Sequence, residues 1–479
     1  MQRDHAARGL TSARVTGFAG SALVALGGLG AGALPVGIPF LPGLRHARVG
    51  LVCVYSGLAL LLLGWWWYGR VTRATEQEDC GRAWRTLALW AAPMLAAPPL
   101  FSRDVYSYLA QGQMIDSGLD VYRHGPAVLG GLVADQVPAV WQHTPSPYGP
   151  AFLIVAKAVA GPLSSHLVLG VLALRLVAIA GLALLAAAIP VLARSTGVNP
   201  PAALWLAVLN PLVLIHLVGG AHNDALMMGL LAAGLAAAVR ERPIVATLLV
   251  AAAALVKVPA ALGLVAVAAI WAAQLRGRLP RIRAAGAVAA TAAVATVLIT
   301  AAAGTGYGWI AALNTPISPQ NWSLTGMLGR WTADLVAHDQ AGVELAERLW
   351  RSAGLLAVLV AAGLVWTYRD RIGPLYGLGI VLVAVVVFGP ALRPWYVVWG
   401  LAPLAASAAG RRVRRLLALS CGVLVLVVLP DGFAADQQRL LLATAGALLG
   451  LAVFLVVRLA VAPATLRPAW TAPGRRGDR

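Results

Sequence analysis

The segment SRDVYSYLAQGQ at 102–113 carries side chains that are suited to sugar chemistry. Asp104 follows a long apolar stretch, and we expect it at the boundary between lipid and water, where partial loss of hydration raises the basicity of a carboxylate. If the segment is helical, Asp104, Tyr108 and Gln111 share one face. Such a face can bind a sugar and deprotonate one of its hydroxyls. The structural alternative for Asp104 is a helix N-cap or an ion pair with Arg103.

The remainder of the same loop ends in TPSPYGPAF at 144–152, where three prolines and a glycine predict a rigid, non-helical stretch before a new helix. A rigid backbone that carries Trp141 and Tyr148 is suited to stacking on a pyranose ring. The alternative for both rings is an interfacial aromatic belt.

A third polar group lies in LNPLVLIHLVGGAHNDALM at 209–227. Asn210–Pro211 breaks an apolar run, and His222, Asn223 and Asp224 follow a glycine pair. Placing an ionisable group in lipid costs about 3 kcal/mol, so we expect these residues to line a polar cavity. The alternative is a polar turn with Asp224 as the helix N-cap.

Two cations complete the candidate site. Lys257 has apolar flanks, and Arg393 lies in GPALRPWYVVW at 389–399. Both fall on the predicted outer side, where they can bind a lipid phosphate, with His222 as a third candidate. The alternative is snorkelling to the headgroups. The predicted residues for sugar or acceptor binding are Tyr106, Tyr108, Gln111, Trp141, Tyr148, Asn223, Asp224, Trp395 and Tyr396. Arg175, inside an apolar run, is expected to serve an internal pair.

The composition shows what must hold these residues in place. Of 479 residues 60% are hydrophobic and only 11% are charged, which predicts a polytopic membrane protein rather than a set of soluble domains. The net charge of +19 comes from short arginine clusters between apolar runs, which is typical of the positive-inside rule and places both termini in the cytoplasm. Nucleic-acid binding would need a basic stripe on a soluble face, so we expect no nucleic-acid partner.

The apolar runs predict an all-α bundle of about 14 (12–14) spans, at roughly 20 residues each, in a single membrane domain over 1–479. The predicted spans are 16–40, 50–69, 86–102, 166–193, 201–218, 225–239, 243–256, 258–274, 284–303, 352–368, 373–389, 395–410, 416–430 and 440–459. A hairpin at Lys257–Pro259 is preferred over one long tilted helix across 243–274. Two long outer loops, 103–165 and 304–351, would contain short interfacial helices, and 463–479 would be a basic cytoplasmic tail.

Searches for other chemistry are negative. The sequence has no P-loop, no dinucleotide-binding glycine pattern after a strand and no paired-histidine metal motif. Three scattered cysteines predict no disulfide framework. We therefore expect no cofactor and no metal site, although a divalent metal is not excluded by the sequence.

The motifs SRDVYSYLAQGQ, TPSPYGPAF, NPLVLIHLVGGAHNDALM (210–227) and GWIAALNT (308–315) resemble those of the polyprenol-phosphate-mannose-dependent α-(1→6)-mannosyltransferases of actinobacterial lipomannan and lipoarabinomannan synthesis. The resemblance covers most of 85–400. It implies a GT-C fold in the plasma membrane and inverting transfer of mannose, on the outer face, from a polyprenyl phosphate to a lipid-linked mannan. It also implies an essential acidic residue in the first outer loop, and Asp104 matches that position.

Two functions from other classes remain open. A glycolipid transporter or flippase would share the spans and the polar cavity, but it would place its charges near the bilayer midplane. A structural membrane subunit would leave the two long outer loops without a purpose. The sequence concentrates its polar side chains on the predicted outer side, and this favours the enzyme.

Overall fold

The structure, a computed structural model, describes residues 2–35, 47–75, 79–312, 323–337, 339–407, 410–432 and 436–461, and within these ranges every regular element is a helix. Six helices are long and apolar enough to cross a membrane, or seven if a bent pair at 200–219 is one span. The chain is thus an all-helical polytopic membrane protein. The count of about 14 spans is not confirmed, because the other predicted spans contain shorter helices. The predicted tail at 463–479 lies outside the described residues.

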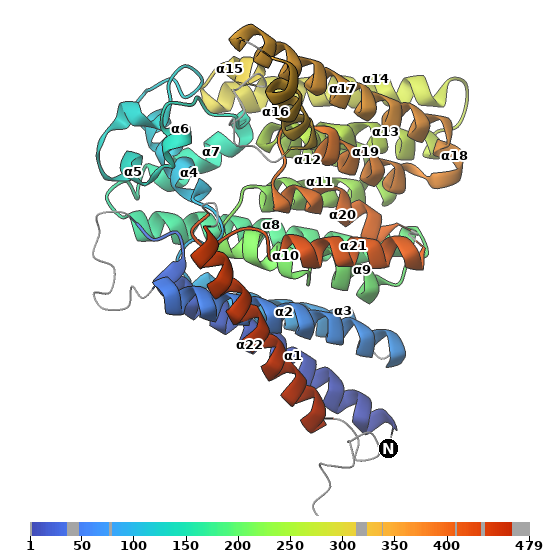
Figure 1. Cartoon of the computed structure of the whole chain (residues 1–479). Coiled ribbons are helices and arrows are strands. Elements are labelled where there is room, and N and C mark those ends of the chain that lie inside the picture. Colours follow the sequence, from blue (N-terminus) through green and yellow to red (C-terminus); the bar gives the residue numbers. More distant parts are fainter. Residues whose placement is uncertain are drawn as a thin grey trace, which may run out of the picture.

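One group of helices lies along the lower edge of Figure 1 and comprises α1 (Gln2–Ala31), α2 (Ala47–Thr75), α3 (Cys80–Leu95) and α22 (Gln437–Val461). Small residues let α1 and α2 pack closely, since a Cβ on Gly20 would meet the backbone of Gly57 and one on Gly27 the backbone of Gly50. Helices in lipid associate through such small-residue contacts because their apolar surfaces gain little by leaving the lipid.

The middle group comprises α8 (Leu167–Ser195), α9 (Pro200–Ala207), α10 (Pro211–Val213), the π-helical turn η2 (Leu214–Gly219), α11 (Asp224–Val239), α20 (Val397–Ala406) and α21 (Arg411–Leu424). It is joined to the first group by two stacked indoles, Trp65 and Trp205, each of which donates its N–H to the other's carbonyl at 2.9 Å. Asn210–Pro211 breaks the helix as predicted, with the Asn210 side chain accepting from the N–H of Leu212.

The third group occupies the upper right of Figure 1 and comprises α12 (Pro243–Val256), η3 (Val258–Ala261), α13 (Leu262–Gln274), α14 (Pro280–Ala303), α16 (Leu324–Val336), α17 (Gln340–Thr367), α18 (Arg369–Ile372) and α19 (Pro374–Phe388). The chain is extended at Lys257, and a Cβ on Gly263 would meet Val250, so the helices on either side of the break pack together. This confirms the hairpin over a single tilted helix.

A last set of short helices gathers at the end of the molecule opposite the N-terminus: α4 (Asp104–Asp116), η1 (Pro126–Leu129), α5 (Gly131–Gln136), α6 (Ala139–Gln142), α7 (Pro150–Ala160) and α15 (Gly308–Ala311) (Figure 1). The two predicted outer loops therefore meet at one end. The interfacial position of these helices stays a prediction. Most of α4 is buried, and Gly112 lets it approach α7 so closely that a Cβ would meet the carbonyl of Ala156.

Two helix boundaries differ from those of the predicted spans. The span expected at 86–102 ends as a helix at Leu95, because Pro98 and Pro99 cannot continue it, and a non-helical segment runs from 96 to 103. The helix α17 begins at Gln340, so the last part of the predicted loop 304–351 is helical.

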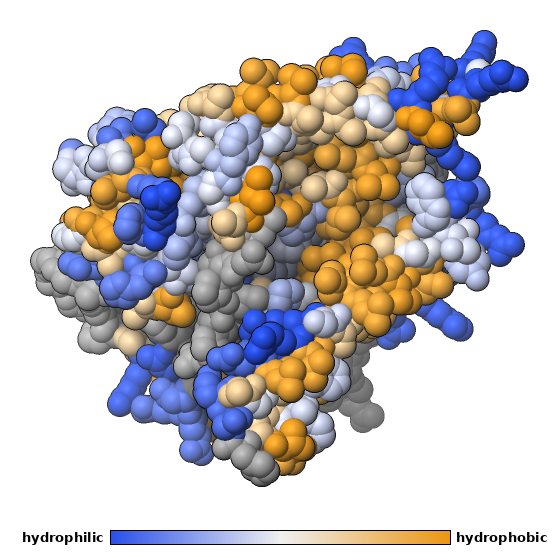
Figure 2. Space-filling model, turned by 90° about the horizontal axis from the view of Figure 1, so that it is seen from above, coloured by the Kyte–Doolittle hydropathy of each residue, from blue (hydrophilic) through white to orange (hydrophobic). Residues whose placement is uncertain are grey.

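The surface of the third group has the character expected of a lipid-facing surface. Figure 2 shows broad apolar areas over the helices, with hydrophilic residues gathered toward the two ends. Large apolar side chains of α14 and α17 are more than half exposed, among them Val294, Leu298, Leu355 and Leu356. An exposed apolar area of this size marks contact with lipid or protein.

We predict that replacing Gly229 by leucine disrupts the core. A Cβ there would meet the carbonyl of Gly181, so α8 and α11 would have to separate. Overpacking costs typically about 1–3 kcal/mol, and we expect a lower melting temperature in detergent. The matched control is Gly286→Leu on α14, where a Cβ meets nothing within 4 Å. Equal melting temperatures for the two variants would contradict this packing.

Candidate active site

Asp104 is held at the first turn of α4 by its neighbours. Its backbone N–H donates to the hydroxyl of Ser102 at 3.1 Å. The N-cap position belongs to Arg103, so Asp104 is not the cap. The guanidinium of Arg103 donates to the carbonyls of Leu34 (3.1 Å) and Gln136 (3.3 Å). Asp104 is therefore neither the N-cap of α4 nor the partner of Arg103, and its carboxylate contacts a different part of the chain.

The partner of Asp104 is a buried histidine from a distant part of the chain. His222 is fully buried, and its Nδ1 lies 3.6 Å from the Asp104 Oδ2, while the Asp104 side chain remains 23% exposed. The Tyr108 hydroxyl, one turn along α4, lies 3.4 Å from the same Nδ1 and donates to the Asn223 Oδ1 at 3.4 Å. The predicted face of α4 thus meets the predicted polar turn before α11.

Burial sets the protonation of this pair. Burial raises the pKa of Asp104, and the opposing charges of Arg393 and Lys257 reduce that increase without cancelling it. Burial lowers the pKa of His222 well below its usual value, and Lys257 and Arg393 lower it further. The result is a basic carboxylate beside a neutral imidazole, which is the state expected of a proton acceptor.

A second carboxylate has a different environment. Asp224 is 1% exposed and accepts two hydrogen bonds from the Lys257 ammonium, at 3.0 and 2.9 Å. It also accepts from the indole N–H of Trp399 at 2.7 Å. The ammonium lies 4.4 Å from the ring centre of Tyr396, which stacks on Trp399. Asp224 begins α11 without capping it, and its carboxylate forms this buried ion pair.

The rigid stretch before α7 joins the site through α4. The Gln111 Oε1 accepts from the hydroxyl of Ser146 at 3.0 Å, and the ring of Tyr148 meets that of Tyr108 edge to face at 5.3 Å. The hydroxyl of Tyr122 donates to the carbonyl of Tyr148 at 2.9 Å. The stretch is non-helical and is followed by a new helix, as its prolines predict, and it packs against α4 beside Tyr108.

Several polar atoms of the site are buried without a partner among the described residues. They are both ring nitrogens of His216, the His222 Nε2, the Asn223 Nδ2 and the Trp395 Nε1. Trp395 stacks on His222 with ring centres 4.0 Å apart. Buried polar groups in a folded core are nearly always paired, so several unpaired ones in one place indicate a functional site.

The guanidinium of Arg393 has no hydrogen bond or ion pair with a described residue, in contrast to the ammonium of Lys257. It is nevertheless close enough for its charge to act on both Asp104 and His222. Among the described residues of the site, the Lys257 ammonium is therefore paired and the Arg393 guanidinium is not.

The backbone around the site is strained. Phe101 and Ala221, which precede Asp104 and His222, have positive φ angles of 61° and 52°. Such angles are unusual for residues other than glycine. The π-helical turn η2 ends at Gly219, two residues before Ala221. Strained residues and π-helical turns persist where the surrounding structure imposes them, and they are common at functional sites.

Two predicted residues do not join the cluster through any contact within the described ranges. Tyr106 is fully buried and donates its hydroxyl to the carbonyl of Ala33 at 2.8 Å. Trp141 is half-buried in α6 and makes no ring contact with the site. Sequence reasoning missed Ser102, Ser146, His216 and Trp399. Of these, Trp399 had a signal, because Trp395, Tyr396 and Trp399 follow a helical spacing.

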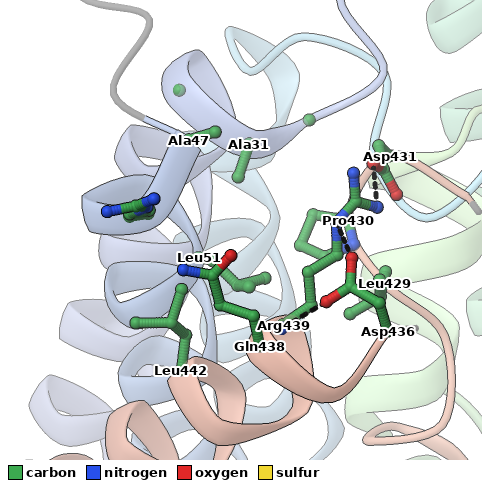
Figure 3. A pocket seen from close by; sticks show the side chains of 13 residues that line it. Ala31, Ala47, Leu51, Leu429, Pro430, Asp431, Asp436, Gln438, Arg439 and Leu442 are labelled. Carbon is green, nitrogen blue, oxygen red and sulfur yellow. Dashed lines mark hydrogen bonds and ion pairs between the residues drawn. The ribbon is translucent and has the colours of Figure 1, made fainter.

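A pocket of ≈ 380 Å³ lies between the end of α1, the start of α2 and the start of α22 (Figure 3). Its charges largely satisfy one another, since Arg439 lies 3.0 Å from Asp431 and 3.4 Å from Asp436. Its wall supports the site, because the Pro430 carbonyl accepts from the N–H of Phe101 at 2.7 Å.

Among the described residues, no group of three or more His, Cys, Asp or Glu is placed to hold a metal ion.

Comparison with known proteins matches two successive regions of the chain. Residues 14–273 match the family model described as "Alpha-(1->6)-mannopyranosyltransferase, N-terminal domain", and residues 321–458 match "MptB C-terminal domain". No solved structure shows a significant match.

Curated relatives are similar over most of their length. The chain is 38% identical over 439 residues to alpha-(1->6)-mannopyranosyltransferase A of Mycobacterium tuberculosis, which is 87% of this chain and 84% of that protein. It is 32% identical over 487 residues to alpha-(1->6)-mannopyranosyltransferase B of Corynebacterium glutamicum, 93% of this chain and 81% of that protein. The chain belongs to the α-(1→6)-mannopyranosyltransferase family.

Proposed function

We propose that this protein is an inverting mannosyltransferase that moves mannose from polyprenyl-phosphate mannose to the 6-hydroxyl of a lipid-linked α-mannan. The observation that carries the proposal is the position of Asp104, a partly exposed carboxylate of raised pKa beside a neutral His222. Family membership supports mannosyl transfer, since the relatives are named for it.

In this proposal Asp104 is the general base. It takes the proton of the acceptor's primary hydroxyl as that oxygen bonds to the anomeric carbon, on the face opposite the phosphate. The bond from the anomeric carbon to the phosphate oxygen breaks, and its electron pair stays on the phosphate. Inversion to an α product requires a β-linked sugar in the donor. A phosphate leaving group needs no proton, so one base suffices.

The leaving phosphate gains one negative charge, and the site can compensate for it. Protonation of Asp104 removes a negative charge near Arg393, which has no ion-pair partner among the described residues. We assign Arg393 to the donor phosphate. Lys257 uses two of its three N–H donors on Asp224, so a third can reach a phosphate oxygen. Charge stabilisation of this kind is a large component of catalysis.

The neighbouring polar and aromatic groups can bind the two sugars. Tyr148 and Tyr396 present half-buried rings near Asp104, and the Asn223 Nδ2 and Trp395 Nε1 are unpaired donors. We assign them to sugar and acceptor binding, together with Tyr108 and Gln111. For Tyr106 and Trp141 the contacts described above favour a structural role.

We further propose that the site faces the outside of the plasma membrane. Support comes from the arginine distribution in the sequence, which favours a cytoplasmic N-terminus. The end that carries α4 to α7 lies opposite that terminus in Figure 1. A lipid-linked donor and acceptor could then both reach Asp104 along the membrane surface.

We predict that Asp104→Asn lowers kcat for mannose transfer by about 10²–10⁴-fold, because the amide cannot accept the proton. Purified protein with polyprenyl-phosphate mannose and a short α-mannoside provides the assay. Asp116→Asn, at the exposed end of the same helix, is the matched control and should retain activity. Near-normal turnover by Asp104→Asn would exclude the base assignment.

The pH dependence of the wild-type enzyme gives an independent prediction. Because the folded pKa of Asp104 is raised, the active carboxylate form is lost as the pH falls through that raised value. The acid limb of kcat/KM should therefore lie above the ordinary aspartate pKa of about 3.9. A limb at or below that value would show that Asp104 is not the titrating base.

Lys257 allows a test that separates stability from donor binding. Lys257→Met leaves Asp224 buried without its counter-charge, and we expect a loss of about 3–5 kcal/mol in unfolding free energy. The double variant Asp224→Asn/Lys257→Met should regain much of that stability. If Lys257 also contacts the donor phosphate, the KM for the donor stays raised in the double variant. If the double variant recovered both the unfolding free energy and the wild-type KM for the donor, the contact between Lys257 and the phosphate would be contradicted.

A further inference from the structure

One guanidinium joins two helix ends that lie far apart in the sequence. Arg175 lies in α8 and is 1% exposed. Its Nη1 donates to the carbonyls of Leu95 at 2.8 Å and Ala97 at 2.6 Å, where α3 ends. Its Nε and Nη2 donate to the carbonyls of Val218 and Gly219, each at 3.1 Å, where η2 ends. The internal partners expected for Arg175 are therefore backbone carbonyls rather than a carboxylate.

The chemistry of these partners explains why an arginine stands here. The last carbonyls of a helix have no partner within that helix and carry the negative end of its dipole. Two such ends meet at Arg175, in a region where water is scarce. Arginine has five N–H donors in a planar fork and stays charged, so a single side chain can satisfy both ends.

The two helix ends lead directly to the proposed catalytic pair. Asp104 follows Ala97 by seven residues, and His222 follows Gly219 by three. The two segments also bond each other, since the N–H of Leu100 donates to the Gly219 carbonyl at 3.2 Å. Displacement of either segment would therefore change the separation of Asp104 and His222.

We infer that Arg175 is a positioning residue, which holds the segment 96–103 against the end of η2 and so sets the Asp104–His222 geometry. It contacts backbone carbonyls and acts on the reaction only through the backbone. The expected effect on kcat rests on the proposed function, whereas the expected effect on the backbone of the two segments does not.

The test compares Arg175→Lys and Arg175→Met with Leu185→Ala, a fully buried residue ten positions further along α8. Lysine keeps the positive charge, but its single ammonium group cannot donate to both helix ends as the planar guanidinium does. We expect Arg175→Met to lower kcat by about 10²-fold, since small displacements of catalytic groups have effects of that size. The kcat of Arg175→Lys should lie between that of Arg175→Met and that of the wild type. The KM for the donor should change by less than about twofold, because Arg393 and Lys257, which we assign to the donor phosphate, lie outside both segments.

Hydrogen exchange of the purified protein supplies the readout that a merely structural role would not move. Amides in 96–104 and 214–222 should exchange faster in both Arg175 variants. Leu185→Ala should lower the melting temperature while leaving exchange in those two segments and kcat close to wild type. If Arg175→Met does not fold, the exchange and kcat of Arg175→Lys decide.

Two results would overturn the inference. One is that hydrogen exchange in both segments stays unchanged in the Arg175 variants. The other is that kcat falls in proportion to the loss of melting temperature, by the same relation in the Arg175 variants and in Leu185→Ala. Failure of the proposed function is distinguishable, because the wild-type protein would then transfer no mannose. The exchange measurement would still test the positioning role in that case.

Discussion

The site depends on the meeting of two interrupted helices. Pro98 and Pro99 end α3 early, and Asn210–Pro211 begins a short helical stretch that stops at Gly219. Non-helical backbone inside a membrane protein must find hydrogen-bond partners within the protein. The guanidinium of Arg175 supplies them at both helix ends. The starts of α4 and α11, each with an aspartate, are thereby brought to one place.

The two aspartates then acquire different chemical characters from their surroundings. Asp224 is buried and accepts hydrogen bonds from Lys257 and Trp399, so its charge is already compensated within the protein. Asp104 keeps partial access to solvent and faces a neutral His222, which leaves it able to accept a proton. Enzymes commonly assign separate roles to two carboxylates by such a difference in environment. Family membership joins this arrangement to mannosyl transfer.

The sequence allowed much of this to be predicted, and the exceptions have physical reasons. The helical class, the hairpin at Lys257 and the placing of Asp104 and Tyr108 on one helix face follow from apolar runs, proline positions and helical spacing. The span count was not settled, because a run such as 201–218 reads as one span although it is broken. The partners of Arg175 and the Asp224–Lys257 pair depend on contacts between distant segments, which no local pattern records.

The most direct measurement is the linkage and anomeric configuration of the product. Purified protein would be incubated with β-linked polyprenyl-phosphate mannose and a short α-mannoside, and the product would be analysed by NMR. The account predicts a new mannose in α linkage to a 6-hydroxyl, formed only when the intact lipid donor is supplied. Transfer from a sugar nucleotide in place of the lipid donor, or a product with the configuration of the donor retained, would contradict it.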